Sequence, residues 1–360
     1  MNKRIIVKIG SQVLCDLDGA LNREVLSHLV EQLASLRADG WQVLLVSSGA
    51  VAAGSGLAGE RLQKISDPVA RKQVMAATGQ VCLMQTYREL FEKQGLTIAQ
   101  VLATKSDFQS RRHYLNMRGC IEALLTAGII PVVNENDVVS VTELMFTDND
   151  ELAGLLAAML DAKGLFLLSD IDGIYLPGSD NSVIQQWRDR HARPILSAAT
   201  AGSNLGRGGI HTKLRVARRV ANLGIETWIA NARRPNVVAD LLQGTGQGTH
   251  FAAKRRASPV KRWVAASDGH EKGWVVINHG AVEALCDNRR LTSLLPVGIT
   301  AIKGEFEKGD VLRIESESGE LIALGKAGYG SGAARKSLGQ RGGRALVHYD
   351  YLYIEQDTSG

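Results

Sequence analysis

Strand-like and helix-like segments alternate along the first two thirds of this chain, and that alternation limits its fold more than any other feature. Predicted strands are continuous apolar runs, such as Arg4–Ile9, and predicted helices carry apolar residues three and four apart, such as Asn22–Ala38. The remaining predicted strands are 41–46, 97–102, 129–133, 164–169 and 226–230, and the remaining predicted helices are 68–93, 113–127, 149–160 and 212–222. Strands that are apolar throughout must be covered on both faces, so the sequence predicts an α/β fold with a mainly parallel sheet sandwiched by helices.

The pattern changes near residue 252. The segment 253–271 is rich in Lys and Arg, contains Pro259 and has little periodicity, which is typical of a linker. Short β-like runs separated by glycines and charged turns then follow, at 274–277, 298–303, 311–316, 321–326 and 345–353. We therefore expect a large domain over 1–252, a linker over 253–271 and a small β-rich domain over 272–354, a division that suits 360 residues.

The composition excludes several classes of protein. A chain that is 45% hydrophobic and 22% charged can bury a large core and is typical of soluble globular proteins. The first apolar run is short and is interrupted by Lys8, which indicates neither a secretory signal nor a membrane span and predicts a cytoplasmic protein. The four cysteines are far apart with no CxxC spacing, so we expect no zinc site, no disulfide framework and no metal-ligating set. A net charge of +5 is compatible with a polyanionic partner without requiring one.

Two common nucleotide-binding motifs are absent or misplaced. No GxxxxGK[ST] segment occurs, which argues against a P-loop nucleoside triphosphatase. Gly54–Gly59 matches GxGxxG, but the preceding predicted strand ends near Val46, too early for a dinucleotide-binding turn.

Two other segments have the chemistry of a phosphate site. Lys8 ends the first predicted strand and is followed by Gly10 and Ser11, so an ammonium group and accessible backbone N–H groups would lie together. The glycine-rich segment Gly206–Lys213 leads into a helix, whose N-terminus attracts anions, and Lys213 adds a charge in its first turn. The alternatives are a strand-end lysine that extends to water and a flexible loop.

Three polar clusters could bind a ligand: the first suits a carboxylate or a phosphate, and the other two suit a zwitterionic amino acid. Ser47–Ala50 follows a predicted strand, Asn134–Asp137 follows another, and Asp148–Asp150 opens a predicted helix. Carboxylates can pair with an α-ammonium group, whereas amides and backbone N–H groups can bind carboxyl oxygens. Taken singly, the first cluster could be a helix N-cap, and Asn136 and Asn149 could be ordinary turn residues.

In this order, six segments resemble motifs of the amino acid kinase family: VKIGSQVL, VSSGAVAAG, PVVNENDVV, FTDNDELA, LLSDIDGIY and GRGGIHTKL. The C-terminal segments GWVVINHGAVEAL, SLLPVGITAIKGEFEKGDVLRI and ALGKAGYGS are similar to a PUA domain, so the resemblance spans the chain. It implies the amino acid kinase fold followed by a PUA domain. The NEND and DND segments are similar to the corresponding motifs in the branch of the family that phosphorylates L-glutamate.

The resemblance implies a reaction and its partners. The γ-phosphoryl group of ATP, with Mg²⁺, would be transferred to the side-chain carboxylate of L-glutamate, giving L-glutamyl 5-phosphate in the first step of proline biosynthesis. Proline would act as a feedback inhibitor, and the enzyme would be a homo-oligomer, either a dimer or a tetramer. A glutamate carboxylate is already ionised at neutral pH, so no general base is needed, in keeping with a sequence in which no His or Cys stands out.

The same resemblance implies residue roles. The catalytic residues would be Lys8, Lys213 and Asp150, with Asp150 holding the two lysines. The substrate-binding residues would be Ser48, Gly49, Ala50, Asn134, Asp137, Asp148 and Asn149. The ATP-binding residues would be Lys8, Gly10, Ser11, Ser169, Asp170, Arg207, Gly208, Gly209, Ile210, His211, Thr212 and Lys213. Ser169 departs from the family by replacing a usual threonine, and Arg207 and His211 replace residues that are usually small.

Two other functions stay open at this point. One is another kinase of the same fold, acting on acetylglutamate or aspartate. The other is RNA binding through the C-terminal domain, because the segment 323–344 contains five basic residues and no acidic one. The basic residues are Lys326, Arg335, Lys336, Arg341 and Arg344. The same segment could instead be a solvated surface loop.

Overall fold

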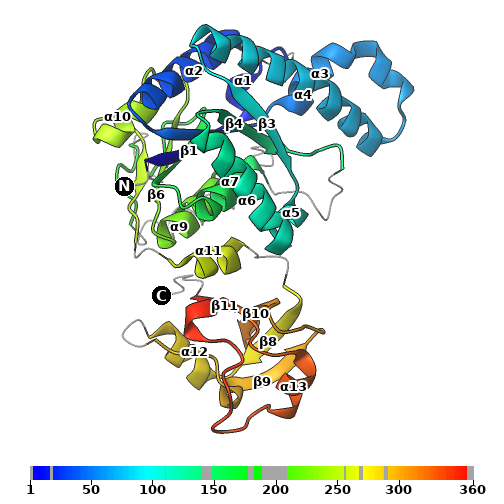
Figure 1. The fold of residues 1–360 in the computed structure, drawn as a ribbon, viewed down its shortest axis with the longest axis vertical. Coiled ribbons are helices and arrows are strands. Elements are labelled where there is room, and N and C mark those ends of the chain that lie inside the picture. The colour runs from blue at the N-terminus through cyan, green and yellow to red at the C-terminus, as the bar shows by residue number, and fades with distance from the viewer. Residues whose placement is uncertain are drawn as a thin grey trace. The chain divides into compact units, whose positions relative to one another are not determined.

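The computed structural model divides the chain into two compact units, Met1–Arg256 and Ala257–Gly360 (Figure 1). It describes residues 3–16, 19–109, 111–139, 148–176, 182–188, 209–254, 257–266, 271–287 and 291–354. Within these ranges no helix is long and apolar enough to span a membrane.

A seven-stranded sheet forms the centre of the first unit, with the strand order β3-β4-β2-β1-β5-β6-β7. Its strands are β1 (Arg4–Ile9), β2 (Gln42–Ser47), β3 (Ile98–Ala103), β4 (Ile130–Glu135), β5 (Gly164–Ser169), β6 (Glu226–Asn231) and β7 (Thr249–Phe251). Neighbouring strands are parallel except for β7, which pairs antiparallel with β6. The predicted mainly parallel sheet is therefore confirmed.

Helices cover both faces of this sheet (Figure 1). One layer contains α1 (Ser11–Leu14), α2 (Arg23–Ala38), α4 (Pro68–Lys93) and α10 (Val237–Gln243). The other contains α6 (Arg111–Thr126), α7 (Asn149–Met159) and α9 (Ile210–Asn222), with α5 (Lys105–Gln109) packed on α6. Successive side chains of a strand point to opposite faces, so Val7 and Ile9 join the core beneath α2 while Lys8 points toward the layer of α7 and α9.

Helix α3 (Ala50–Ala58), followed by a 3-10 turn over Gly59–Lys64, was not predicted and lies alongside α4 (Figure 1). The two helices approach so closely that only glycine fits at two positions. A Cβ atom at Gly54 would lie 1.8 Å from the carbonyl oxygen of Met75, and one at Gly79 would lie 1.8 Å from that of Ala50. The glycine at position 54 of the GxGxxG match therefore serves helix packing.

The second unit contains a five-stranded sheet with the order β12-β11-β10-β8-β9. Its strands are β8 (Gly273–Ile277), β9 (Ile299–Lys303), β10 (Val311–Ser316), β11 (Leu321–Lys326) and β12 (Leu352–Ile354). Only β10 and β8 are parallel; the other neighbours are antiparallel. Its described residues form the helices α11 (Pro259–Ala266), α12 (His279–Cys286) and α13 (Ser331–Lys336), with 3-10 turns at Pro296–Gly298 and Tyr349–Tyr351.

Two expectations for the C-terminal region differ from the structure. The segment 253–271 is not linker throughout, because α11 forms within it and packs on β11 and β12, burying Trp263 and Val264. The predicted final strand 345–353 is shorter in the structure, since Tyr349–Tyr351 forms a 3-10 turn and only Leu352–Ile354 pairs with β11.

The α3–α4 contact yields a test of stability. Gly79→Ala should lower the free energy of unfolding by about 2 kcal/mol, because the new methyl group meets backbone rather than a movable side chain. Gly119→Ala, in α6, has open space around the new methyl group and should raise it by about 0.5 to 1 kcal/mol. Urea-induced unfolding of both variants measures the difference, and equal stabilities would contradict the proposed close contact.

Candidate active site

The carboxyl ends of β1, β2 and β5 are joined by backbone hydrogen bonds. The N–H group of Ser48 donates to the carbonyl oxygen of Ile9 at 3.3 Å, and that of Gly10 donates to Leu168 at 3.1 Å. Strand β1 lies between β2 and β5. The strands β2, β4 and β3 continue the sheet on one side of β1, and the later strands β5, β6 and β7 continue it on the other side, so the strand order reverses direction at this point. Open α/β sheets usually bind their ligands in the crevice that such a change of direction creates.

Three charged side chains meet at this edge. The Nζ atom of Lys8, on β1, lies 2.6 Å from Oδ1 of Asp150 on α7. The Nζ atom of Lys213, in the first turn of α9, lies 3.0 Å from Oδ2 of the same carboxylate. All three residues are buried, with exposed fractions of 4% for Lys8, 0% for Asp150 and 7% for Lys213. The structure therefore brings together the three residues expected to be catalytic.

The electrostatics of this cluster suit an anionic ligand. Burial by itself would raise the pKa of Asp150, but the positive charges and hydrogen bonds of Lys8 and Lys213 hold it below its ordinary value. Two ammonium groups sharing one carboxylate leave these three side chains with a net positive charge. The ammonium groups of Lys8 and Lys213 can each interact with a phosphate group as well as with Asp150.

The residues expected to bind ATP surround this cluster where they are described. Gly10 precedes Ser11, and a Cβ atom at Gly10 would lie only 3.6 Å from Nζ of Lys8, so glycine leaves the ammonium group open on that side. Gly209 is the N-cap of α9 and has no side chain to occupy that helix end. Ile210, His211 and Thr212 form the first turn of α9 beside Lys213.

The other end of the expected ATP site lies at the end of β5. Ser169 is buried, and its Oγ atom has no hydrogen-bond partner among the described residues. Asp170 is exposed directly after it. Arg207 and Gly208 lie outside the described residues.

Three of the residues expected to bind the amino acid form one hydrogen-bonded cluster. The Nδ2 atom of Asn149 donates to Oγ of Ser48 at 2.8 Å and to Oδ1 of Asn134 at 3.0 Å. The Nδ2 atom of Asn134 donates in turn to Oε1 of Gln80 at 2.8 Å. Backbone groups set the orientation of both asparagines, because Asn149 also donates to the carbonyl oxygen of Ser47 and Asn134 accepts from the N–H group of Glu135.

Several buried polar atoms near this cluster have no hydrogen-bond partner within the described ranges: Oδ1 of Asn149, Oδ2 of Asp148 and Nε2 of Gln80. The other oxygen of Asp148 caps α7 by accepting from the N–H groups of Asp150 and Glu151. Burial and the negative charge of Asp150 raise the pKa of Asp148 to about 6. Buried polar groups are nearly always satisfied, so two acceptors and one donor left over at one site indicate a ligand that carries both kinds of group.

The other residues expected to bind the amino acid lie outside this hydrogen-bonded cluster: Asp137, Gly49 and Ala50. Asp137 follows β4 and accepts from Nζ of Lys72, on α4, at 2.8 Å. Gly49 has a positive φ of 97°, which favours glycine, and α3 begins at Ala50 directly after it. The backbone therefore turns sharply between Ser48 and α3.

The contribution of α4 to this site was not predicted from the sequence. Besides Lys72 and Gln80, this helix supplies Tyr87, whose hydroxyl group lies 2.8 Å from Oγ of Ser47 and whose pKa burial raises. These three polar residues are spaced by eight and seven positions, so they lie on one side of the helix. The sequence signal that could have predicted this contribution is the recurrence of polar residues on the side of a long helix that faces the sheet.

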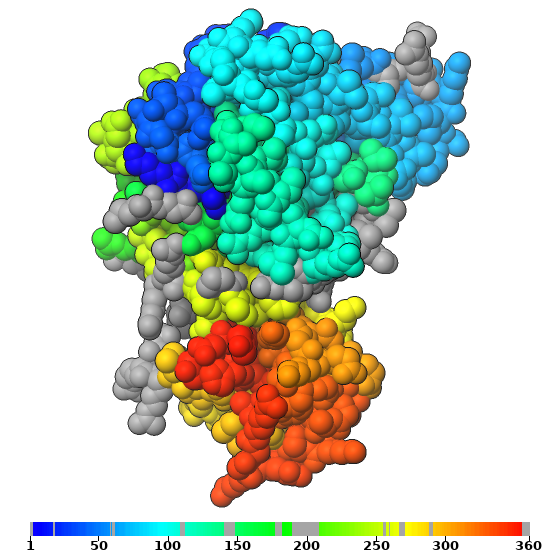
Figure 2. Space-filling model, viewed as in Figure 1, coloured from blue at the N-terminus to red at the C-terminus, as the bar shows by residue number. Residues whose placement is uncertain are grey.

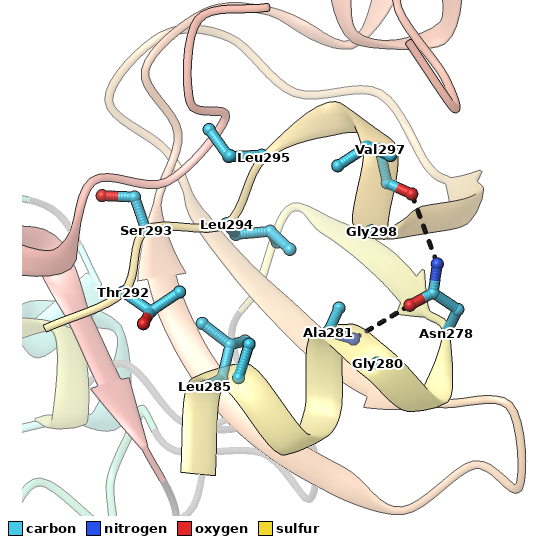
Figure 3. Close-up of a pocket in the computed structure, with 11 residues that line it drawn as sticks. Asn278, Gly280, Ala281, Leu285, Thr292, Ser293, Leu294, Leu295, Val297 and Gly298 are labelled. Carbon is cyan, nitrogen blue, oxygen red and sulfur yellow. Dashed lines mark hydrogen bonds between the residues drawn. The ribbon is translucent and has the colours of Figure 1, made fainter. Parts of the chain in front are cut away.

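A hollow in the second unit has different chemistry (Figure 3). It has a volume of about 230 Å³ and is lined mainly by apolar residues of α12 and of the segment 292–298. Asn278 uses both ends of its amide, accepting from the N–H group of Ala281 and donating to the carbonyl oxygen of Val297 (Figure 3). None of the described residues that line it is charged, so these residues do not provide the groups that neutralise phosphate.

The basic segment 323–344 belongs to the orange to red surface of the second unit in Figure 2. Arg335 forms an ion pair with Glu305 at 2.6 Å, and Nζ of Lys326 lies 5.2 Å from the ring centre of Tyr351. Two of the five basic side chains are therefore already engaged within the unit. Lys336, Arg341 and Arg344 are exposed.

Comparisons with known proteins show the family to which this chain belongs. The family model described as "Amino acid kinase family" matches residues 3–231, and the model described as "PUA domain" matches residues 273–345. The chain therefore belongs to the amino acid kinase family and carries a PUA domain, which confirms the resemblance seen in its motifs.

Curated relatives are similar along the whole chain. The glutamate 5-kinase of Chlorobaculum tepidum is 45% identical over 353 residues, covering 98% of this chain and 97% of the relative. The glutamate 5-kinase of Bacteroides thetaiotaomicron is 46% identical and covers 98% of both chains. The carbamate kinase from Giardia lamblia bound to AMP-PNP is 15% identical with a TM-score of 0.53, covering 70% of this chain and 99% of that one, a likeness that extends to the fold alone.

The shared carboxylate generates a prediction about stability. Asp150→Asn should lower the free energy of unfolding by about 3 kcal/mol, because it leaves two buried ammonium groups without their counter-charge. Asp148→Asn removes a carboxylate from the same turn but retains a good N-cap, and should change stability by less than about 1 kcal/mol. Thermal or urea unfolding measures both, and equal losses would contradict the special place of Asp150.

Proposed function

We propose that the protein transfers the γ-phosphoryl group of ATP to the side-chain carboxylate of L-glutamate, giving L-glutamyl 5-phosphate and ADP, the first step of proline biosynthesis. The observation that carries this proposal is the buried cluster of Lys8, Asp150 and Lys213 at the carboxyl end of the sheet. Its two ammonium groups suit a phosphoryl group in transfer. The choice of glutamate is supported by relatives named glutamate 5-kinase that match nearly the whole chain.

The transfer needs alignment and charge stabilisation rather than proton removal. The γ-carboxylate of glutamate is ionised at neutral pH, so one of its oxygens can attack phosphorus directly while the bond to the bridging oxygen of ADP breaks. Negative charge spreads over the transferring group and the leaving oxygen. Lys8 and Lys213 would stabilise that charge, and Asp150 would hold their ammonium groups in place.

The amino acid would occupy the adjoining polar cluster. Its α-ammonium group has suitable acceptors in Asp137, Asp148 and the free oxygen of Asn149. Ser48, Asn134 and the backbone at Gly49 and Ala50 would complete this part of the site. The adenine nucleotide would lie over Gly10, Ser11, Ser169, Asp170 and the first turn of α9, with Arg207 and Gly208 proposed from the sequence alone.

Mg²⁺ belongs to the proposal as the partner of ATP. Both oxygens of Asp150 contact ammonium groups, and within the described ranges no three His, Cys, Asp or Glu side chains gather to hold a metal ion. The residues described therefore do not form a ligand set of their own. Mg²⁺ in kinases is held largely by substrate phosphates and water, which supports entry together with ATP.

The location of the enzyme, its regulation, its assembly and its binding to RNA are also proposals. Its place in amino acid biosynthesis supports a cytoplasmic location and feedback inhibition by proline. A homo-oligomer is proposed from the family resemblance, and the exposed apolar side chains Leu57, Val69 and Val81 on α3 and α4 are candidates for its contacts. Lys336, Arg341 and Arg344 support RNA binding by the second unit, which a fall in RNA affinity with rising salt would test.

The reaction is tested by formation of a hydroxamate from glutamate, ATP and hydroxylamine. Lys8→Met and Lys213→Met should each reduce kcat by about 100-fold or more, the effect of losing one transition-state donor. Lys64→Met, a matched change of an exposed lysine, should have no effect. An unchanged kcat with only a higher ATP requirement would contradict the assigned role, and faster reaction with aspartate or N-acetylglutamate would contradict the acceptor.

The pKa of Asp148 predicts a pH dependence. Because the ammonium group of glutamate pairs with the ionised carboxylate, kcat/KM for glutamate should fall as pH is lowered through about 6, where Asp148 becomes protonated. Asp148→Asn should have a lower kcat/KM at neutral pH and lack this transition. A pH–rate profile between 5 and 8 compares the two, and a transition that persists in the variant would refute the assignment.

A further inference from the structure

Helix α4 places a lysine directly against the carboxylate proposed to bind the substrate ammonium group. The Nζ atom of Lys72 lies 2.8 Å from Oδ1 of Asp137, and the exposed fractions of the two side chains are 32% and 14%. The next residue, Gln73, donates from Nε2 to the carbonyl oxygen of Val138 at 2.7 Å. Two consecutive residues of α4 therefore hold the turn that follows β4.

The charge of Lys72 changes what this turn can bind. Alone, Asp137 would attract any cation that reached it. Paired with Lys72, it presents a negative and a positive group side by side, an arrangement complementary to the ammonium and carboxylate groups that share the α-carbon of an amino acid. Because the pair is partly buried, its attraction for such a group is stronger than at an open surface.

We propose that Lys72 is a specificity-determining residue that binds the α-carboxylate of the acceptor while Asp137 binds its α-ammonium group. The inference rests on the proposed function, since it assumes an amino acid acceptor whose γ-carboxylate lies at Lys8 and Lys213. The site would then select a zwitterionic α-amino acid and disfavour molecules in which either α-group is neutral. A substrate that lacks the α-carboxylate would leave Lys72 facing an ammonium group of like charge.

The α-amide of glutamate tests this idea, because it retains the γ-carboxylate and the α-ammonium group but replaces the α-carboxylate with a neutral amide. The unmodified protein should prefer glutamate over this amide by about 10- to 100-fold in kcat/KM, the range expected for one charge-assisted hydrogen bond. Lys72→Met should raise KM for glutamate by a similar factor, leave kcat within about twofold, and bring the preference close to one. Where turnover of the amide is too slow to measure, its inhibition constant against glutamate gives the same comparison.

Two control variants separate recognition from structure. Lys93→Met removes an exposed lysine from the other end of α4 and should leave the preference unchanged. Lys72→Arg keeps the charge and should retain most of the preference. Unfolding midpoints show whether each variant is folded.

The outcomes are distinct. A preference that stays the same in Lys72→Met, or an equal loss with glutamate and its amide, would mean that Lys72 only supports the turn and would overturn the proposal. No preference in the unmodified protein would overturn it as well. Failure of the proposed function would look different, because the unmodified protein would then form no hydroxamate from glutamate at all.

Discussion

The carboxylate of Asp150 holds together a site whose parts come from distant regions of the chain. Lys8 belongs to the first strand, whereas Lys213 belongs to a helix near the end of the first unit, and each contacts one oxygen of that carboxylate. Two buried ammonium groups at such close range would repel each other without it. The strand order places β1 in the middle of the sheet, and α7 and α9 lie over the same face. The sheet topology therefore brings Lys8, Asp150 and Lys213 together.

Helix α4 provides a second layer of support behind the residues that would touch the amino acid. Tyr87 contacts Ser47, Gln80 contacts Asn134, and Lys72 contacts Asp137. The position of this helix depends in turn on Gly54 and Gly79, which let α3 and α4 approach at backbone distance. These two glycines thus determine where the polar groups of α4 lie in the site.

Much of this arrangement could be predicted from the sequence, for identifiable reasons. Parallel strands end at one edge of their sheet, so Lys8, Ser48 and Asn134 could be expected to lie near one another once the strands were recognised. The motif resemblance then indicated the pairing of Asp150 with two lysines. In contrast, the partner of Asp137 lies on α4, and nothing in the amphipathic pattern of that helix specifies which strand end Lys72 will reach. Similarly, the charged composition around α11 masked Trp263 and Val264, which are buried only because β11 and β12 provide a surface for them.

The side chains of Asp148, Asn149 and Asp150 have fixed donor and acceptor roles. Asp148 accepts from the amides that open α7, Asn149 donates to three oxygens, and Asp150 accepts from two ammonium groups. An aspartate has almost the shape of an asparagine but cannot donate from its ionised side chain. Slow deamidation of Asn149 would therefore leave the size of the site nearly unchanged while setting a carboxylate oxygen against the carbonyl oxygen of Ser47 and against Oδ1 of Asn134. Deamidation of this single residue would damage the site by replacing a hydrogen-bond donor with an acceptor.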